Sequence, residues 1–277
     1  MEHSKLIKQL RTERKLSQRM LTDGISQRST LSSFEQNNTR ISFEIICLFL
    51  ERMNVTLEEY EYMLVDSKLS SKRKLAAQVA KSFSKPFKRD LAKELLDNYS
   101  STEDFFYYSL YAQYYLVTAY QTPEVSKVEM NRIKKKIKKY LDSIETWGRF
   151  ELVIFSNCLF IFEDNYIRFH FIESIQHMRL YHDSSNYSSD LLKFLINGLN
   201  LSYTRHSTQN INIFMTELEK INEDYDDVKT KMVLKIFKIL IDRENGLDNS
   251  KEKIELQLAL SVLDEDYWIN YIDTHYR

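Results

Sequence analysis

Glycine and proline are scarce in this sequence, with 4 glycines and 2 prolines among 277 residues. A phosphate-binding loop needs several glycines close together, which four scattered glycines cannot provide. Glycine and proline also mark turns and strand ends, so their scarcity favours long helices joined by short connections. We therefore expect an all-α fold, and the length leaves room for one small and one large domain.

Cysteines and long apolar runs are also few. Cys47 and Cys158 lie far apart in the sequence, so neither a disulfide framework nor a thiolate zinc site is expected. The N-terminus is charged, and apolar stretches such as 45–50 are too short to span a bilayer. The sequence has neither an HExxH frame nor a nucleophile elbow. We expect a cytoplasmic protein without a metal, a cofactor or an enzymatic activity.

Positive charge is concentrated near the start of the chain. The formal net charge of the whole chain is −1, which argues against general coating of nucleic acid. Within the first forty residues, however, basic side chains outnumber the acidic residues Glu2, Glu13, Asp23 and Glu35. The basic ones are Lys5, Lys8, Arg11, Arg14, Lys15, Arg19, Arg28 and Arg40. Any affinity for DNA therefore has to reside in this segment.

The first 64 residues have the order of features of a helix-turn-helix unit. Leu6, Ile7 and Leu10 give a first helix one apolar side. Ser17 is placed to cap a second helix. Gly24 can take the left-handed conformation that ends that helix.

Ser26 is placed to cap a third helix, in which Leu31 and Phe34 are expected to be buried. The polar residues Gln27, Arg28, Thr30 and Ser32 then face outward. Arginine pairs with guanine, glutamine pairs with adenine, and hydroxyls bind base edges or phosphates. The alternative is a plain three-helix packing unit with a polar outer face.

Four segments resemble the Xre-type domain of the Rgg/MutR family of transcription regulators: Leu16-Ser17-Gln18, 25–35, Ile41-Ser42-Phe43 and 54–60. The resemblance implies an all-α protein in which a five-helix N-terminal domain precedes a right-handed superhelical stack of tetratricopeptide-like helix pairs. It also implies a dimer on paired DNA half-sites. In many members of the family the helical stack binds short peptide pheromones.

The resemblance also implies roles for individual residues of the N-terminal domain. Gln18 would anchor a phosphate, and Arg11, Lys15 and Arg40 would grip the DNA backbone. The base-facing residues would be Gln27, Arg28, Thr30 and Ser32, with Ser26 at the start of their helix. Cys47 falls where some members carry a cysteine that bridges the two DNA-binding domains of a dimer; its alternative role is that of a small buried apolar residue.

The resemblance and the composition together divide the chain into 1–66 and 67–277, with Ser70-Ser71-Lys72-Arg73-Lys74 as the connection. Pro86 fits the first turn of a helix that runs to about Asn98. Apolar spacing predicts further helices over 105–120, 125–144, 150–162, 191–203, 211–221, 228–241 and 254–263. Because no strict repeat consensus is present, the tetratricopeptide-like interpretation depends on helix lengths and on the family resemblance.

A stack of helix pairs offers a concave surface for an extended peptide. Peptide backbones pair with carboxamides and a terminal carboxylate pairs with arginine, which singles out Asn157, Asn197, Asn200 and Arg149. Taken alone, a residue of this kind is more often an ordinary hydrogen-bonded structural residue, which is the alternative for each of the four.

Two further segments have alternative interpretations. The basic run at 134–139 is either a solvated helix face or a second contact to nucleic acid. Tyr267, Trp268 and Tyr271 are expected to pack against a second copy in a dimer; the alternative is that they cap the helical stack.

The sequence thus predicts a cytoplasmic transcription regulator that binds promoter DNA as a homodimer and is controlled by a short apolar peptide. In the alternative, the helical domain docks a protein partner or a small molecule. A third hypothesis is a helical scaffold with a vestigial DNA-binding domain.

Overall fold

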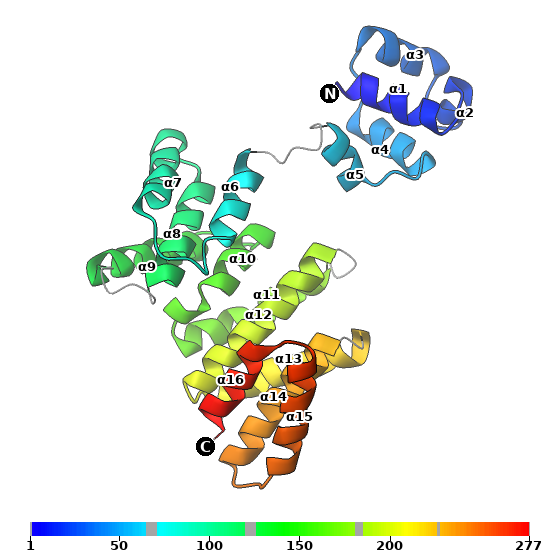
Figure 1. Cartoon of the computed structure of the whole chain (residues 1–277). Coiled ribbons are helices and arrows are strands. Elements are labelled where there is room, and N and C mark those ends of the chain that lie inside the picture. Colours follow the sequence, from blue (N-terminus) through cyan, green and yellow to red (C-terminus); the bar gives the residue numbers. More distant parts are fainter. Residues whose placement is uncertain (1, 65–70, 120–125, 181–184, 226–227, 277) are drawn as a thin grey trace. The chain divides into compact units, whose positions relative to one another are not determined.

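The computed structural model of the chain describes residues 2–64, 71–119, 126–180, 185–225 and 228–276. These ranges hold sixteen α-helices, one short 3-10 helix and no strand (Figure 1). The predicted all-α fold is confirmed. The chain divides into two compact units, Met1–Lys85 and Pro86–Arg277. The predicted boundary between residues 66 and 67 lies outside the described residues.

The first unit contains the predicted five-helix domain and one further helix. Its helices are α1 (His3–Glu13), α2 (Gln18–Thr22), α3 (Arg28–Asn37), α4 (Phe43–Arg52), α5 (Leu57–Leu64) and α6 (Ser71–Ala80). The predicted connection at 70–74 is helical from Ser71 onward, where α6 begins. Residue 70 lies outside the described ranges.

Local sequence signals fix the turn between α2 and α3. The Ser17 hydroxyl accepts a hydrogen bond from the Met20 backbone N–H at 3.1 Å, as expected of a helix N-cap. Gly24 has a φ of +68°, the left-handed conformation that a residue without Cβ adopts easily. Leu21 and Leu31 are fully buried on the two sides of this turn. Their burial fixes α3 against α2.

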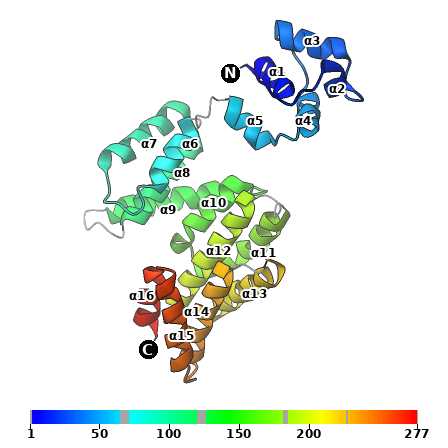
Figure 2. The same ribbon diagram turned by 45° about the vertical axis from the view of Figure 1, so that its right-hand side comes forward.

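The second unit is a run of helices that pack mainly on their neighbours in the chain (Figure 2). The helices are α7 (Arg89–Thr102), α8 (Phe105–Ala119), α9 (Lys127–Asp142), α10 (Arg149–Asn157), η1 (Leu159–Ile161), α11 (Asp164–Leu180), α12 (Ser185–Thr204), α13 (Thr208–Tyr225), α14 (Val228–Glu244), α15 (Ser250–Val262) and α16 (Asp266–His275). Helix α10 packs on both α8 and α12, so these three form one layer.

The predicted helices are present in this unit. The structure has two further helices, and one predicted helix begins at a later residue than expected. Helices α11 and α16 were not among the predicted ranges. Pro86 does not start α7, which begins at Arg89 with Lys88 as its N-cap. None of the described helices is both long and apolar enough to cross a membrane.

Candidate nucleic-acid interface and peptide surface

Helix α3 presents its polar side chains on the outside of the first unit. Gln27 and Arg28 are exposed, and Thr30 and Ser32 are half-buried. Leu31, by contrast, is fully buried. The arrangement leaves the first turns of α3 open to a DNA groove, which is the geometry that a recognition helix needs.

Ser26 does not have the position predicted for it. The N-cap of α3 is Gln27, and Arg28 is the first helical residue. The hydroxyl oxygen of Ser26 is buried and has no hydrogen-bond partner. The prediction that Ser26 caps α3 is therefore wrong, and its hydroxyl is not exposed to DNA.

Arg11 is also placed differently from the prediction, because its guanidinium faces inward. It donates hydrogen bonds to the Glu35 carboxylate at 2.7 and 2.8 Å and to the carbonyl oxygen of Leu16 at 2.7 Å. Arg11 is 9 % exposed. All of these hydrogen bonds are internal, which contradicts the prediction that Arg11 grips the DNA backbone.

Gln18 takes part in the same network. Its side-chain amide donates to Glu35 at 2.9 Å, and its oxygen accepts a long 3.5 Å contact from Arg28 Nε. Burial alone would raise the pKa of Glu35, but the hydrogen bonds from Arg11 and Gln18 outweigh burial and lower it. The carboxylate of Glu35 therefore joins α1, α2 and α3, and Gln18 connects it to Arg28. The sequence interpretation missed this role of Glu35.

Lys15 and Arg40 remain open to solvent. Both side chains are exposed, and neither takes part in an ion pair with any described residue. Lys15 follows the end of α1 with a φ of 55°, and Arg40 lies between α3 and α4. Two uncompensated cations therefore flank the helix-turn-helix.

In the second unit, carboxamide side chains line up across the layer of α8, α10 and α12. Asn157 donates to the side-chain oxygen of Gln113 at 2.8 Å, and Asn197 donates to the backbone oxygen of Ser156 at 3.4 Å. Asn200 is half-buried, and its side-chain oxygen is buried without a hydrogen-bond partner. The structure thus pairs Asn157 with Gln113, which the sequence interpretation missed, and places Asn197 against the backbone of the residue before Asn157.

Arg149 is already paired within the chain. Its Nε lies 2.7 Å from Asp190 Oδ2, and the Arg149 side chain is 48 % exposed. The pair joins α10 to α12. A peptide carboxylate would have to replace Asp190 to bind this guanidinium.

The aromatic residues of α16 divide into two groups. Trp268 and Tyr271 are 6 % and 9 % exposed and pack against Phe237 of α14. Tyr267 is 61 % exposed. Trp268 and Tyr271 therefore cap their own helical stack, which contradicts the prediction that they contact a second copy; Tyr267 alone stays available.

A stripe of exposed apolar residues on α15 was missed by the sequence interpretation. Ile254, Leu258 and Val262 are 58, 64 and 84 % exposed and follow one another at four-residue intervals. Residues four apart lie on the same side of a helix. The same spacing is typical of a core-facing helix, so the sequence predicts the helix but does not show that this side of it is exposed.

Cys47 of α4 is a half-buried free thiol, and Phe43 four residues earlier is 64 % exposed. The side of α4 that carries Phe43 and Cys47 is thus partly exposed to solvent. The thiol of Cys158, by contrast, is fully buried, and burial raises its pKa to about 12.

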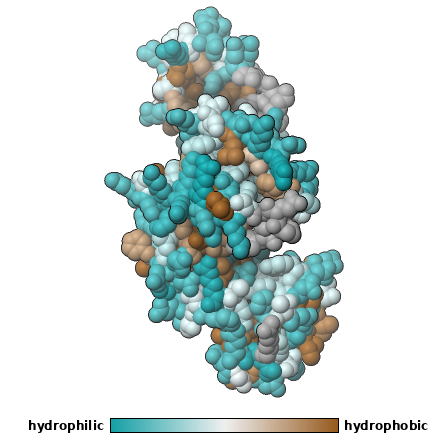
Figure 3. Space-filling view, turned by 90° about the vertical axis from the view of Figure 1, so that its left-hand side faces the viewer, coloured by the Kyte–Doolittle hydropathy of each residue, from teal (hydrophilic) through white to brown (hydrophobic). Residues whose placement is uncertain are grey.

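The basic run on α9 surrounds a buried apolar seam made by Ile133 and Ile137. Lys136 Nζ lies 4.2 and 4.0 Å from the ring centroids of Tyr99 and Tyr108, so this lysine is engaged within the unit. The face of the molecule in Figure 3 is dominated by hydrophilic side chains, with apolar ones in separate small patches. The run has the character of a solvated helix face.

Comparisons with known proteins agree with this architecture. Residues 7–60 match the helix-turn-helix family, and residues 90–274 match the family described as the C-terminal domain of the HTH-type transcriptional regulator Rgg. A search of curated proteins finds no match.

Several solved structures share the fold over nearly the whole chain. The SHP pheromone receptor Rgg2 of Streptococcus dysgalactiae is 20 % identical, with a TM-score of 0.73 over 99 % of this chain and 98 % of that one. A putative transcriptional regulator of Listeria monocytogenes EGD-e is 21 % identical, with a TM-score of 0.70 over 99 % and 95 %. PrgX in its complex with cCF10 is 16 % identical, with a TM-score of 0.72 over 98 % and 90 %. By its match over residues 90–274, the chain belongs to the Rgg family of helix-turn-helix transcriptional regulators.

Proposed function

We propose that this protein is a homodimeric, peptide-responsive transcription regulator that binds promoter DNA through α3. The observation that carries the proposal is the exposed polar start of α3, held against α1 and α2 by a buried carboxylate. A groove-reading helix must be both exposed and rigidly positioned, since base contacts depend on geometry. Such a regulator works in the cytoplasm, where the promoter is.

On the DNA side, the proposed contacts follow the exposure of the side chains. Gln27 and Arg28 read base edges, with the half-buried hydroxyls of Thr30 and Ser32 beside them. Gln18 at the start of α2 remains a candidate phosphate contact through the helix N-terminus. The exposed cations Lys15 and Arg40 neutralise backbone phosphates.

On the regulatory side, we propose that a short peptide lies along the carboxamides of α8, α10 and α12. Gln113 and Asn157 already hydrogen-bond each other, and Asn197 reaches the backbone of α10 through Ser156. Gln113 is 5 % exposed and also donates to the Ser109 carbonyl oxygen, so its role is to hold Asn157 in place. Carboxamides both donate and accept, so the more open members of this row, Asn157 and Asn197, can pair with an extended backbone. Asn200 has a buried unpaired oxygen, and Arg149 can exchange Asp190 for a peptide carboxylate. The relative from Streptococcus dysgalactiae is a pheromone receptor, which supports this assignment.

The proposed dimer uses α15, where Ile254, Leu258 and Val262 form an exposed stripe, together with Tyr267 of α16. Burial of apolar surface is the main favourable contribution to stable association. Cys47 is the candidate for a second, covalent link between the two copies under oxidising conditions, because its thiol is free and half-buried.

The DNA part is tested by gel retardation with the promoter fragments that flank the gene. Arg28→Ala is expected to weaken specific binding by about 1–3 kcal/mol if Arg28 reads a base pair. Lys193→Ala, an exposed lysine of α12, is the matched control and should leave binding unchanged. Unchanged affinity of the Arg28 variant would remove this residue from the interface, and a protein that shifts no promoter fragment would refute DNA binding.

The peptide part is tested by calorimetric titration with synthetic apolar peptides encoded by short reading frames beside the gene. Saturable heat that is reduced by Asn157→Ala and Asn197→Ala supports the carboxamide site. If no such peptide gives saturable heat, a protein partner or small molecule becomes the regulator instead. Both outcomes are independent of the DNA assay.

A further inference from the structure

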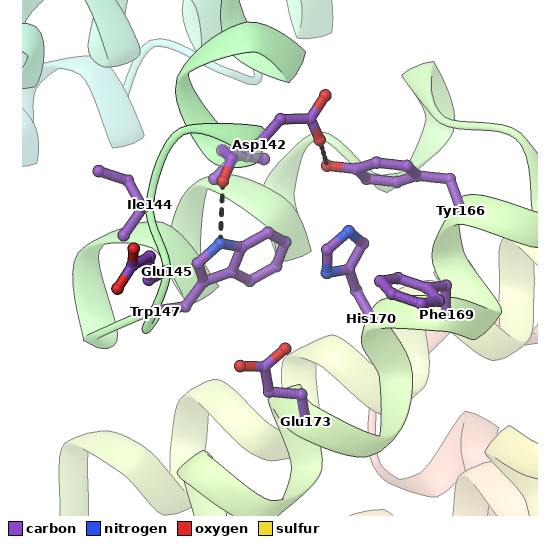
Figure 4. A pocket seen from close by; sticks show the side chains of 9 residues that line it. Asp142, Ile144, Glu145, Trp147, Tyr166, Phe169, His170 and Glu173 are labelled. Carbon is purple, nitrogen blue, oxygen red and sulfur yellow. Dashed lines mark hydrogen bonds between the residues drawn. The ribbon is translucent and has the colours of Figure 1, made fainter.

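A pocket of about 460 Å³ lies where the end of α9, the connection to α10 and α11 meet. Its wall is aromatic: the rings of Trp147 and His170 stack at a centroid distance of 4.5 Å and an interplanar angle of 12°. Tyr166 and Phe169 continue the wall along α11 (Figure 4). The indole nitrogen of Trp147 donates to the Leu141 carbonyl at 3.1 Å, which fixes the ring in place.

Three carboxylates, Asp142, Glu145 and Glu173, line the same pocket. Asp142 is already neutralised by Lys138 at 2.9 Å and accepts a hydrogen bond from the Tyr166 hydroxyl at 2.8 Å. Glu145 and Glu173 are exposed, and neither has a hydrogen-bond or ion-pair partner among the described residues. The described lining contains no lysine or arginine. The pocket therefore carries two uncompensated negative charges beside aromatic rings.

Exposed apolar side chains extend from the rim of the pocket. Phe169 is 77 % exposed and lines the pocket, and Ile172, three residues further along α11, is 65 % exposed. Residues three apart are neighbours on a helix surface. The pocket is thus continuous with a small apolar surface on which a flanking residue can pack.

This pocket is separate from the carboxamide row. Phe155 of α10 packs against both Trp147 and His170, with centroid distances of 5.1 and 6.0 Å. Asn157 follows Phe155 by two residues, which is a rotation of about 200° around an α-helix. The two surfaces therefore lie on opposite sides of α10.

We propose that this pocket docks a protein partner that inserts an arginine or lysine side chain between Glu145 and Glu173 and lays an adjacent apolar residue on Phe169 and Ile172. Charge complementarity identifies the partner, because a cation meets two unpaired carboxylates beside the exposed ring of Phe169. The chain itself contains an example of the same chemistry. Lys138 Nζ lies 3.9 Å from the Tyr166 ring centroid while it pairs with Asp142.

The first arm of the test uses Trp147 as a reporter. The sequence has 2 tryptophans, so the full-length Trp268→Phe protein leaves Trp147 as the only one. The fluorescence of this protein is titrated with acetyl-Leu-Arg-Leu-amide and with acetyl-Leu-citrulline-Leu-amide, in which an uncharged urea replaces the guanidinium. We expect saturable binding of the arginine peptide only. Equal binding of the two peptides, or binding of neither, overturns the proposal.

The second arm uses charge-neutral variants of the protein. Glu145→Gln combined with Glu173→Gln is expected to weaken binding of the arginine peptide about tenfold, as the loss of two weak ion pairs predicts. Glu219→Gln, which removes an exposed carboxylate of α13 outside the pocket, should leave binding unchanged. Equal effects of the two changes would refute the site.

A third arm separates a polypeptide partner from a small cation. Arginine amide alone should bind about tenfold more weakly than the tripeptide, because it lacks the apolar residues that pack on α11. Equal affinity for the two ligands would show a small-cation site and overturn the docking proposal. Phe169→Ser, an exposed position that tolerates polarity, should reduce tripeptide affinity to that of arginine amide.

Discussion

Arg11 and Glu35 form a two-point ion pair inside the helix-turn-helix domain. The Nε–Oε1 and Nη2–Oε2 distances are 2.7 and 2.8 Å, and the two side chains are 11 % and 1 % exposed. The pair joins α1 to α3, and Gln18 of α2 donates to the same carboxylate. One buried acidic group therefore determines how the proposed recognition helix sits on the two helices before it.

Arg11→Ala is expected to destabilise this domain by about 3–5 kcal/mol, because it leaves the Glu35 charge buried without its partner. The measurement is hydrogen–deuterium exchange of peptides from residues 2–64 in the full-length protein. Lys5→Ala is the control, since Lys5 pairs with Glu2 on the surface and should cost little. The double change Arg11→Met and Glu35→Leu should restore much of the protection from exchange. Equal exchange in the single and double variants would show that the unpaired Glu35 charge does not cause the loss of stability.

The same carboxylate predicts a pH dependence. Burial opposes ionisation of Glu35, but its hydrogen bonds hold the pKa of the folded state below the usual value. A group with a lowered folded pKa contributes stability that is complete above its unfolded pKa, about 4.3, and is lost as the pH falls through the folded value. Hydrogen–deuterium exchange gives the free energy of unfolding of the wild type and of Glu35→Gln. The difference between the two values should therefore shrink below about pH 4. A gap that is constant across this window would contradict the assignment.

The backbone contacts predict a salt effect. Lys15→Ala and Arg40→Ala should each reduce the slope of log affinity against log salt concentration by about 1, with little change in sequence preference. Both side chains are exposed cations beside the helix-turn-helix. Retardation assays at several salt concentrations give the slope, and Lys135→Ala, on the α9 face, serves as the control. An unchanged slope for either variant would exclude that residue from phosphate contact.

Local sequence signals predicted the helix-turn-helix well because they act over a few residues. The Ser17 cap and the left-handed Gly24 depend only on their immediate neighbours, and the structure has both. The prediction for Arg11 failed because the role of this residue is set by Glu35, a partner 24 residues away. The sequence nevertheless contained a signal for the pair. Arg11 follows the buried Ile7 by four residues and Glu35 follows the buried Leu31 by four, which places both on apolar sides of their helices.

Apolar periodicity cannot distinguish a core face from a docking face. The stripe on α15 and the aromatic residues of α16 have similar spacing, yet Leu258 is exposed and Trp268 is buried. Only the positions of neighbouring helices separate the two cases. The carboxamide row has the same limitation, because Gln113 and Asn157 are 44 residues apart and meet only through helix packing.

Gly198 of α12 lies directly against the ring of Phe214 in α13. A Cβ built on Gly198 would lie 2.1 Å from ring atoms of Phe214, which is fully buried. Gly198→Ala is therefore expected to cost about 1–3 kcal/mol through overpacking. Gly148→Ala is the control, because its Cβ would meet only Glu151 at 3.5 Å. Urea denaturation followed by the fluorescence of Trp147 and Trp268 compares the two; equal midpoints would show that Phe214 moves aside without cost.

The α15 stripe predicts how the proposed dimer can be broken. Leu258→Glu places a charge in the middle of the stripe, between Ile254 and Val262, where dimer formation would desolvate it. In analytical ultracentrifugation, we expect the dissociation constant of the dimer to rise at least about tenfold. The helical circular dichroism spectrum should stay unchanged, because Leu258 is exposed within one chain. Val128→Glu, at a 78 % exposed position of α9, is the matched control. A Leu258 variant that remains as dimeric as the control would place the contact between copies elsewhere.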